Sequence, residues 1–269
     1  MKAVALESLG TRWARRICGL GFCCVSLAAA AATQASDTPP PSADAPGVVN
    51  ITGTKDPEIR SYRSVQRGLE AFDEYRHLAP AAELRFRFAH KGGLPVTEAD
   101  GLALKLVSDE TSFPIPVDPD GHFSVMRSQA AFEGDATFFL NRKKGMFVYY
   151  PSIRTPGLPP NVRRLGDLRL ECFVTQAVAK DEIPFMARMF INTVLRTTNW
   201  CAKENFSTGF PAYGQVTKVT LRDGAKKGEF SFENGKFSAP IGSRNFSDDA
   251  LIELTYVEAA SVDAAVKAP

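Results

Sequence analysis

One segment of the sequence occurs twice, at a constant spacing. Residues 121–136 and 235–250 align without a gap, displaced by 114 positions, and six of the sixteen aligned residues are identical. The identical pairs are Gly121/Gly235, Phe123/Phe237, Ser124/Ser238, Phe132/Phe246, Asp135/Asp249 and Ala136/Ala250. Such a repeat predicts two copies of one β unit. The alternative is a chance likeness between two hairpins of an all-β chain.

Both copies begin at a hairpin signal. Asp120-Gly121 and Asn234-Gly235 tolerate the positive φ angles of two-residue hairpin loops. In the second copy phenylalanine alternates with polar residues on both sides of the turn, which predicts a hairpin. Three prolines precede the first turn, so its incoming strand should be short or lie at a sheet edge. Each copy should end in a strand, over residues 136–141 and 250–257.

Residues 1–35 have the character of a secretory signal peptide. Three arginines precede an apolar stretch over residues 17–32, and Thr33-Gln34-Ala35 offers small residues for cleavage. The stretch is shorter than the roughly 20 residues of a membrane-spanning helix. An uncleaved anchor is the alternative, whereas a twin-arginine signal and a lipid anchor fit the flanking residues poorly. The sequence therefore predicts a periplasmic or secreted protein with no transmembrane span after cleavage.

Removal of this segment changes the charge balance. Residues 1–35 carry four basic residues and one acidic residue, a net charge of +3, so the chain's +2 becomes about −1. A chain without excess positive charge has no overall field that would attract nucleic acid or an anionic membrane. We therefore expect no nucleic-acid partner.

Cleavage would leave two cysteines, Cys172 and Cys201. In an oxidising compartment, an even pair is most simply a disulfide. Two isolated cysteines without clustered histidines are a poor metal site, so we expect no metal.

Composition and periodicity outline the first half of the chain. Residues 36–56 are poor in side chains that a core would bury, which predicts a flexible lead-in. Asp56 followed by Pro57 is typical of a helix start, and an apolar stripe predicts an amphipathic helix to about residue 77. Alternating residues predict strands over 84–88 and 102–107. We therefore expect a helix and a first β domain over residues 57–150.

Three short motifs in this region resemble a known module. They are Leu94-Pro95-Val96, Leu104-Lys105-Leu106-Val107 and Asp118-Pro119-Asp120-Gly121-His122-Phe123. In this order they resemble the carboxypeptidase regulatory-like, transthyretin-like β-sandwich family over about 60 residues. The resemblance implies a structural or binding module that is not catalytic, and it carries over no site residue. The segment 141–172 also resembles stretches of uncharacterised exported bacterial proteins.

A proline-rich stretch predicts the domain boundary. Four prolines lie between residues 151 and 160, so we expect a linker over 151–164, a second β domain with a helix over 165–258 and a tail over 259–269. The second domain should open with a strand over 168–175 that carries Cys172. A helix capped by Asp181 should follow. The apolar stripe of this helix consists of Met186, Met189, Phe190 and Val194. We predict that it is part of the core; a ligand-accepting surface is the alternative.

The fold class expected from these elements is mainly β, with two tandem β-sandwich-like domains that each carry an accessory helix. Around the expected boundary, seven basic residues and one acidic residue give residues 142–169 a net charge of +6. The basic residues are Arg142, Lys143, Lys144, Arg154, Arg163, Arg164 and Arg169. They suggest a rim for an anionic glycan, a lipid headgroup or an acidic protein surface. The alternative is solvated surface that acidic residues elsewhere balance.

Motifs of catalysis are missing from the sequence. It has no glycine-rich phosphate loop, no His-Glu-x-x-His and no Gly-x-Ser-x-Gly, and its three histidines have no nucleophile nearby in sequence. A Ser/His/Asp site assembled across the fold stays open, since geometry defines such sites. We therefore expect an exported, non-catalytic binding or structural module of the bacterial envelope without a cofactor. The alternative is an envelope hydrolase with an unconventional site.

Overall fold

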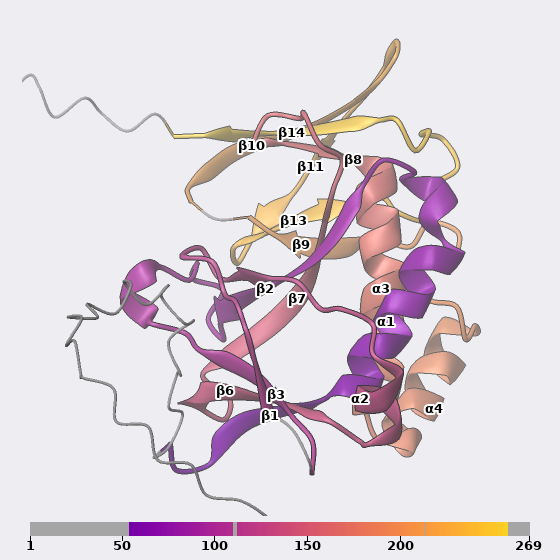
Figure 1. Cartoon of the computed structure of the whole chain (residues 1–269). Helices are drawn as coiled ribbons and strands as arrows, with labels where there is room; N and C mark the ends of the chain where they lie inside the picture. The colour runs from indigo at the N-terminus through magenta and orange to yellow at the C-terminus, as the bar shows by residue number, and fades with distance from the viewer. Residues whose placement is uncertain (1–53, 110–111, 213, 258–269) are drawn as a thin grey trace, which may run out of the picture. The chain divides into compact units, whose positions relative to one another are not determined.

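The computed structural model describes residues 54–109, 112–212 and 214–257 (Figure 1). The leader predicted over 1–35, most of the predicted lead-in and the predicted tail lie outside these residues. Within them the strands form two four-stranded and two three-stranded sheets, which confirms the prediction of a mainly β fold.

The elements fall into an N-terminal half, residues 57–154, and a C-terminal half, residues 162–256. The first comprises β1 (Pro57–Ser61), α1 (Tyr62–Glu74), η1 (Arg76–Leu78), β2 (Glu83–His90), η2 (Glu98–Asp100), β3 (Leu104–Val107), β4 (Ser112–Ile115), β5 (His122–Phe123), α2 (Gln129–Glu133), β6 (Thr137–Lys143) and β7 (Phe147–Arg154). The second comprises β8 (Val162–Arg164), α3 (Leu165–Glu182), α4 (Phe185–Leu195), β9 (Thr208–Pro211), β10 (Val216–Asp223), β11 (Lys226–Phe230), β12 (Phe232–Glu233), β13 (Lys236–Ala239) and β14 (Leu251–Tyr256).

The two halves have sheets of corresponding order. The four-stranded sheets run β1-β6-β3-β4 and β8-β14-β10-β11, with antiparallel pairing throughout. In each half, a helix begins directly after the first strand, and its first N–H donates to the alanine that ends the repeated segment. These bonds are Tyr62 N–H to Ala136 O, 2.9 Å, and Leu165 N–H to Ala250 O, 2.8 Å. This correspondence agrees with a common unit, whereas its origin by duplication stays a prediction.

The two predicted hairpin turns differ in length. Asn234 and Gly235 have φ angles of 51° and 72° between the paired residues Glu233 and Lys236, as a two-residue loop requires. In the first copy, Asp118 N–H donates to His122 O and Gly121 N–H donates to Asp118 O, both at 2.8 Å. Residues 119–121 therefore form a three-residue loop between Asp118 and His122. Within this loop Gly121 takes the left-handed conformation. The segment that pairs with β5 across this turn is short, a single bridge between Val117 and Phe123. The proline-containing strand β4 pairs with β3 at the edge of another sheet.

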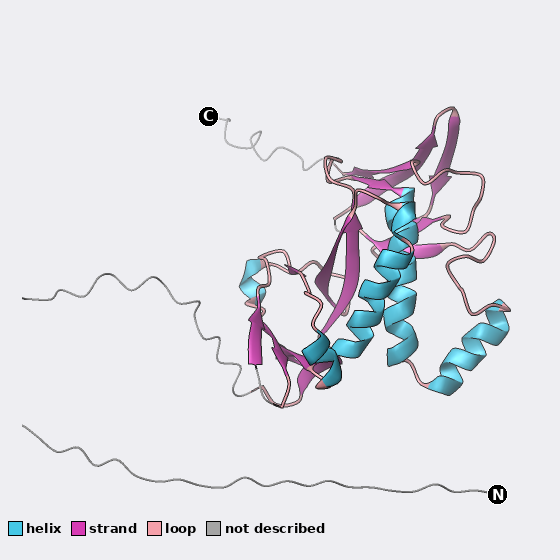
Figure 2. Ribbon diagram, turned by 45° about the vertical axis from the view of Figure 1, so that its right-hand side comes forward, coloured by secondary structure: helices cyan, strands magenta, loops and turns pink. Residues whose placement is uncertain are grey.

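Each half has its own hydrophobic core, and a third cluster connects them. Phe123 and Phe237 belong to the cores of the N-terminal and C-terminal halves. The third cluster joins side chains from both halves: Phe72, Ala79, Ala82, Ile153, Leu170 and Val174. Helices α1 and α3 lie side by side along it (Figure 2). They approach closely at Gly68, where a Cβ would stand 2.8 Å from a methyl group of Val178. The division into two domains therefore stays a prediction.

The start of α1 corrects the sequence prediction. The helix begins at Tyr62 rather than at Pro57, and its cap is Ser61, whose hydroxyl accepts a hydrogen bond from Arg63 N–H. Residues 57–61 instead form β1, which pairs with β6. The predicted apolar stripe from Tyr62 to Phe72 is buried, as expected.

The strand predicted over residues 168–175 is wrong, because this segment lies within the 18-residue helix α3. Ten of its residues are buried, so α3 lacks the polar stripe by which a surface helix is recognised. A short apolar run that is buried on most sides has the same sequence character in a helix as in a strand.

The expectation that the apolar stripe of α4 is core is also wrong. The helix begins at Phe185, after Pro184, and no residue in it is buried. Its large apolar residues are exposed by 48% or more: Phe185, 60%; Met186, 74%; Met189, 48%; Phe190, 71%; Val194, 61%. The surface alternative therefore fits the structure better.

The linker predicted over 151–164 is partly strand. Residues 151–154 belong to β7, and residues 162–164 form β8. Pro151 fits within β7 because β7 is an edge strand of the sheet β5-β2-β7, where a missing N–H leaves no neighbouring strand unpaired.

The predicted disulfide between Cys172 and Cys201 is present, with a Cα–Cα distance of 5.9 Å. Both cysteines are buried in the C-terminal core. Trp200 lies next to the bridge, where its backbone N–H donates to Gln176 and its indole N–H donates to Asn192. Among the helices of the described residues, none has the length and apolar character needed to cross a bilayer.

Candidate functional site

The seven predicted basic residues do not form one patch. Arg142, Lys143 and Lys144 lie at the turn between β6 and β7. The Arg142 guanidinium donates to the carbonyl oxygens of Asn141, Asp100 and Gly101. The side chains of the two lysines are exposed.

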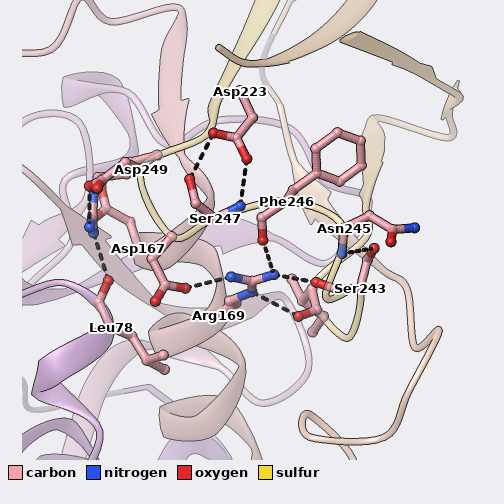
Figure 3. Close-up of polar contacts among 12 residues, drawn as sticks. Leu78, Asp167, Arg169, Asp223, Ser243, Asn245, Phe246, Ser247 and Asp249 are labelled. Carbon is pink, nitrogen blue, oxygen red and sulfur yellow. Dashed lines mark hydrogen bonds and ion pairs between the residues drawn. The ribbon is translucent and has the colours of Figure 1, made fainter. Parts of the chain in front are cut away.

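Arg164 and Arg169 bond to the loop that precedes β14. Figure 3 shows Arg169 beside Ser243 and Phe246 of this loop. Arg169 donates to the carbonyl oxygens of Ile241, Ser243 and Phe246 and to the carboxylate of Asp248. Arg164 donates to Leu78 O and to Asp249. Five residues between 241 and 249 accept hydrogen bonds from the two guanidinium groups. Arg164 and Arg169 therefore stabilise the conformation of this loop.

Arg154 and Arg163, in contrast, line a cavity of about 150 Å³ between the two halves. We call it the arginine cavity. Its wall is formed by Arg87, His122, Tyr150, Pro151, Ser152, Arg154, Pro160, Arg163, Glu171, Pro211, Ala212, Phe237, Leu254 and Tyr256. Three arginines and the Glu171 carboxylate lie in this wall, and the Asp120 carboxylate is bonded to the wall residue His122. Positive charges therefore exceed negative charges by one.

The register of the sheet β5-β2-β7 explains why polar groups meet on this side. Residues directly opposite each other in paired strands point to the same face of the sheet. Arg87 lies opposite His122 on one side and Tyr150 on the other, and Arg85 lies opposite Ser152. Their neighbours in sequence point to the hydrophobic core: Phe86, Phe123 and Ile153.

Arg163 and Glu171 form a buried ion pair in the wall of the cavity. Nη2 of Arg163 donates to the Glu171 carboxylate at 2.6 Å and to Ile153 O at 3.1 Å. Burial raises the pKa of Glu171, and the Arg163 charge opposes that shift. Nε of Arg163 is buried, and none of the described residues accepts a hydrogen bond from it. A buried donor without an acceptor is costly in free energy.

Arg154 lies beside this pair. Its guanidinium donates to the carbonyl oxygens of Pro159, Pro160 and Val162, which fixes its position. Burial and the neighbouring Arg163 charge lower the pKa of Arg154. Two guanidinium groups held close together repel each other, and an anion between them would relieve that repulsion.

The side chains of Asp120, His122 and Ser152 are connected by hydrogen bonds next to the cavity. Nδ1 of His122 lies 2.7 Å from Oδ2 of Asp120, and Nε2 of the same ring lies 3.2 Å from Oγ of Ser152. Burial lowers the pKa of the His122 imidazole below its ordinary 6.5. Asp120 opposes that shift, whereas Arg87 and Arg85 add to it. The imidazole is therefore neutral at neutral pH.

Sequence reasoning identified two of these cavity residues, Arg154 and Arg163, and missed the others. It treated His122 as part of a turn and did not single out Arg87, Ser152 or Glu171. The only local signal was the spacing Asp120-x-His122, a carboxylate and an imidazole two residues apart at the predicted turn. Nothing local connects them with Ser152.

Within the part of the chain that the structure describes, no three His, Cys, Asp or Glu side chains are grouped so as to hold a metal ion. The resemblance to the transthyretin-like module stays a prediction. Comparisons with protein-family models, with curated proteins and with solved structures find no match for this chain.

Proposed function

We propose that this chain is an exported binding protein of the bacterial envelope that takes a small organic anion into the arginine cavity. The observation that carries the proposal is the charge at the cavity: Arg87, Arg154 and Arg163 against the carboxylates of Glu171 and Asp120, with His122 neutral. The unpaired Nε of Arg163 supports it, because a phosphate or carboxylate oxygen would accept its hydrogen bond.

The volume of the cavity narrows the choice of ligand. Pockets for drug-sized molecules measure roughly 300 to 1,000 Å³, whereas this cavity measures about 150 Å³. It therefore suits an anionic headgroup or a short acid rather than a protein surface. The side chains of Tyr150 and Tyr256 provide aromatic surface on which a sugar or acyl part of the ligand would pack.

The cysteines support the proposed compartment. Disulfides persist in the periplasm and outside the cell, where no glutathione pool reduces them. The buried bridge between Cys172 and Cys201 supports export, as does the signal-like segment over residues 1–35.

Titration calorimetry at low ionic strength would test the anion site. The full-length chain is expressed in bacteria and purified from the envelope, and then titrated with inorganic phosphate, citrate and glycerol 3-phosphate. We expect at least one of these anions to bind. The variant Arg154→Gln should bind it at least ten-fold more weakly, since a hydrogen bond to a charged group contributes about 1.5–3 kcal/mol.

The matched control is Arg142→Gln, which removes the same charge at the far turn between β6 and β7. This variant should bind the anion as wild type does. Thermal unfolding of both variants would show that they are folded. The proposal would be overturned if no anion of the panel bound, or if Arg142→Gln weakened binding as much as Arg154→Gln.

A further inference from the structure

The arrangement of Asp120, His122 and Ser152 goes beyond anion binding. Asp120 lies in the turn before β5, His122 is the first residue of β5, and Ser152 lies in β7. Strands β5 and β7 both pair with β2. The histidine is held on both sides, by a carboxylate at 2.7 Å and a serine hydroxyl at 3.2 Å. These contacts have the order and the distances of a nucleophile, a base and a group that orients the base.

We propose that Ser152 is a nucleophile in the arginine cavity, that His122 is its general base, and that the chain hydrolyses an ester of a small organic anion. The substrate class rests on the anion site proposed above. Asp120 is the positioning residue, because its carboxylate accepts hydrogen bonds from the backbone N–H and the ring of His122.

The protonation state of His122 suits this role. The Asp120 carboxylate accepts a hydrogen bond from Nδ1–H, so the lone pair of the neutral ring lies on Nε2, toward Ser152. The charged groups that bear on the ring are Asp120 from the turn and Arg85 and Arg87 from β2. The side chain of His122 is 17% exposed, whereas that of Asp120 is 56% exposed.

The reaction would proceed in two steps. Oγ of Ser152 bonds to the ester carbonyl carbon, its proton passes to Nε2 of His122, and the bond from carbon to the alcohol oxygen breaks as that oxygen takes the proton. Water then adds to the acyl carbon and gives a proton to His122; the bond to Oγ breaks, and Oγ recovers the proton. The guanidinium groups of the cavity wall place positive charge near the oxyanion of each step.

The fold itself does not require these residues. The corresponding hairpin of the C-terminal half has Asn234 where the first has Asp120, and Lys236 where the first has His122. It nevertheless closes a turn and places Phe237 in the core. The carboxylate and the imidazole are therefore additions to the hairpin, as a site requires.

Labelling with an uncharged alkyl fluorophosphonate tests the nucleophile directly. Oγ of a reactive serine bonds to phosphorus, fluoride leaves, and the proton passes to the base, so the adduct is visible as a mass increase of the intact protein. We expect one adduct, on the peptide that contains Ser152, and none on Ser152→Ala. Because general bases contribute about 10²–10⁴-fold, His122→Gln should label at least 100-fold more slowly.

The control is Ser124→Ala, which removes a hydroxyl from the same hairpin outside the cavity and should label at the wild-type rate. Thermal unfolding would confirm that every variant is folded. Labelling elsewhere than Ser152, or equal labelling of wild type and His122→Gln, would overturn the proposal. Since the probe is uncharged, labelling without anion binding would overturn the anion site alone, and anion binding without labelling would overturn the nucleophile alone.

The pH dependence of labelling tests the role of Asp120. The neutral imidazole is the active form, so the rate should rise with pH through a midpoint below 6.5. Asp120 raises the pKa of the ring, so Asp120→Asn should move the midpoint to lower pH and reduce the plateau about ten-fold. An unchanged midpoint would show that Asp120 does not orient or polarise His122, and would overturn its role.

Discussion

Replacing Gly166 by alanine should lower the free energy of unfolding by about 3 kcal/mol. Gly166 is the second residue of α3, and a Cβ there would overlap the carbonyl oxygen of Leu78 and approach the Arg164 guanidinium to 2.5 Å. The Leu78 oxygen is backbone and accepts a hydrogen bond from Arg164 at 2.7 Å, so it has little freedom to move. Gly166 N–H also donates to Asp248 O at 2.8 Å.

Urea unfolding of Gly166→Ala would measure this loss. Gly92→Ala is the matched control, because no atom lies within 4 Å of the position of its Cβ, and its φ is not positive. We expect the free energy of unfolding of Gly92→Ala to lie within about 0.5 kcal/mol of the wild-type value. Equal stability of Gly166→Ala and wild type would contradict the tight junction between η1, α3 and the loop at Asp248.

Prediction from the sequence was correct for helices and strands with one buried face and one solvent-exposed face. The stripe of α1 and the alternation in β2 belong to such elements, and so does the hairpin at Asn234-Gly235. It failed for α3, because a helix that contacts α1, β7 and the C-terminal core has too little polar surface to show a helical period. It also failed for α4, where apolar side chains at helical spacing point to solvent.

The basic stretch shows a different limit of sequence reasoning. Its net charge of +6 counted only residues 142–169, whereas the partners of its arginines lie elsewhere in the chain. Asp248 and Asp249 are about 80 residues downstream, and Glu171 lies just beyond the stretch. Ser152 meets His122 only through the register of β2 with β5 and β7. Contacts between residues far apart in the chain determine which side chains meet in a site, and they leave no local pattern in the sequence.

Replacing both Cys172 and Cys201 by alanine should lower the free energy of unfolding by about 3 to 4 kcal/mol. The bridge closes a loop of 29 residues, and the chain-entropy model assigns roughly that stabilisation to a loop of this length. For a chain of this size, the loss corresponds to about 10 °C in Tm. Calorimetry of the double variant, and of wild type with and without a thiol reductant, would measure it.

The bridge should matter most for α4, which lies inside the closed loop. This helix buries no residue of its own, so its position depends on the bridge, on the bond from Trp200 to Asn192, and on the bond from Arg188 to Lys180 O. Without the bridge the segment should open locally before the rest unfolds. Trypsin should then cleave the double variant at Arg188 and Arg196 faster than wild type, while cleavage at Arg222 in β10 stays slow. Equal cleavage of both proteins at Arg188 would show that side-chain packing alone holds α4 in place.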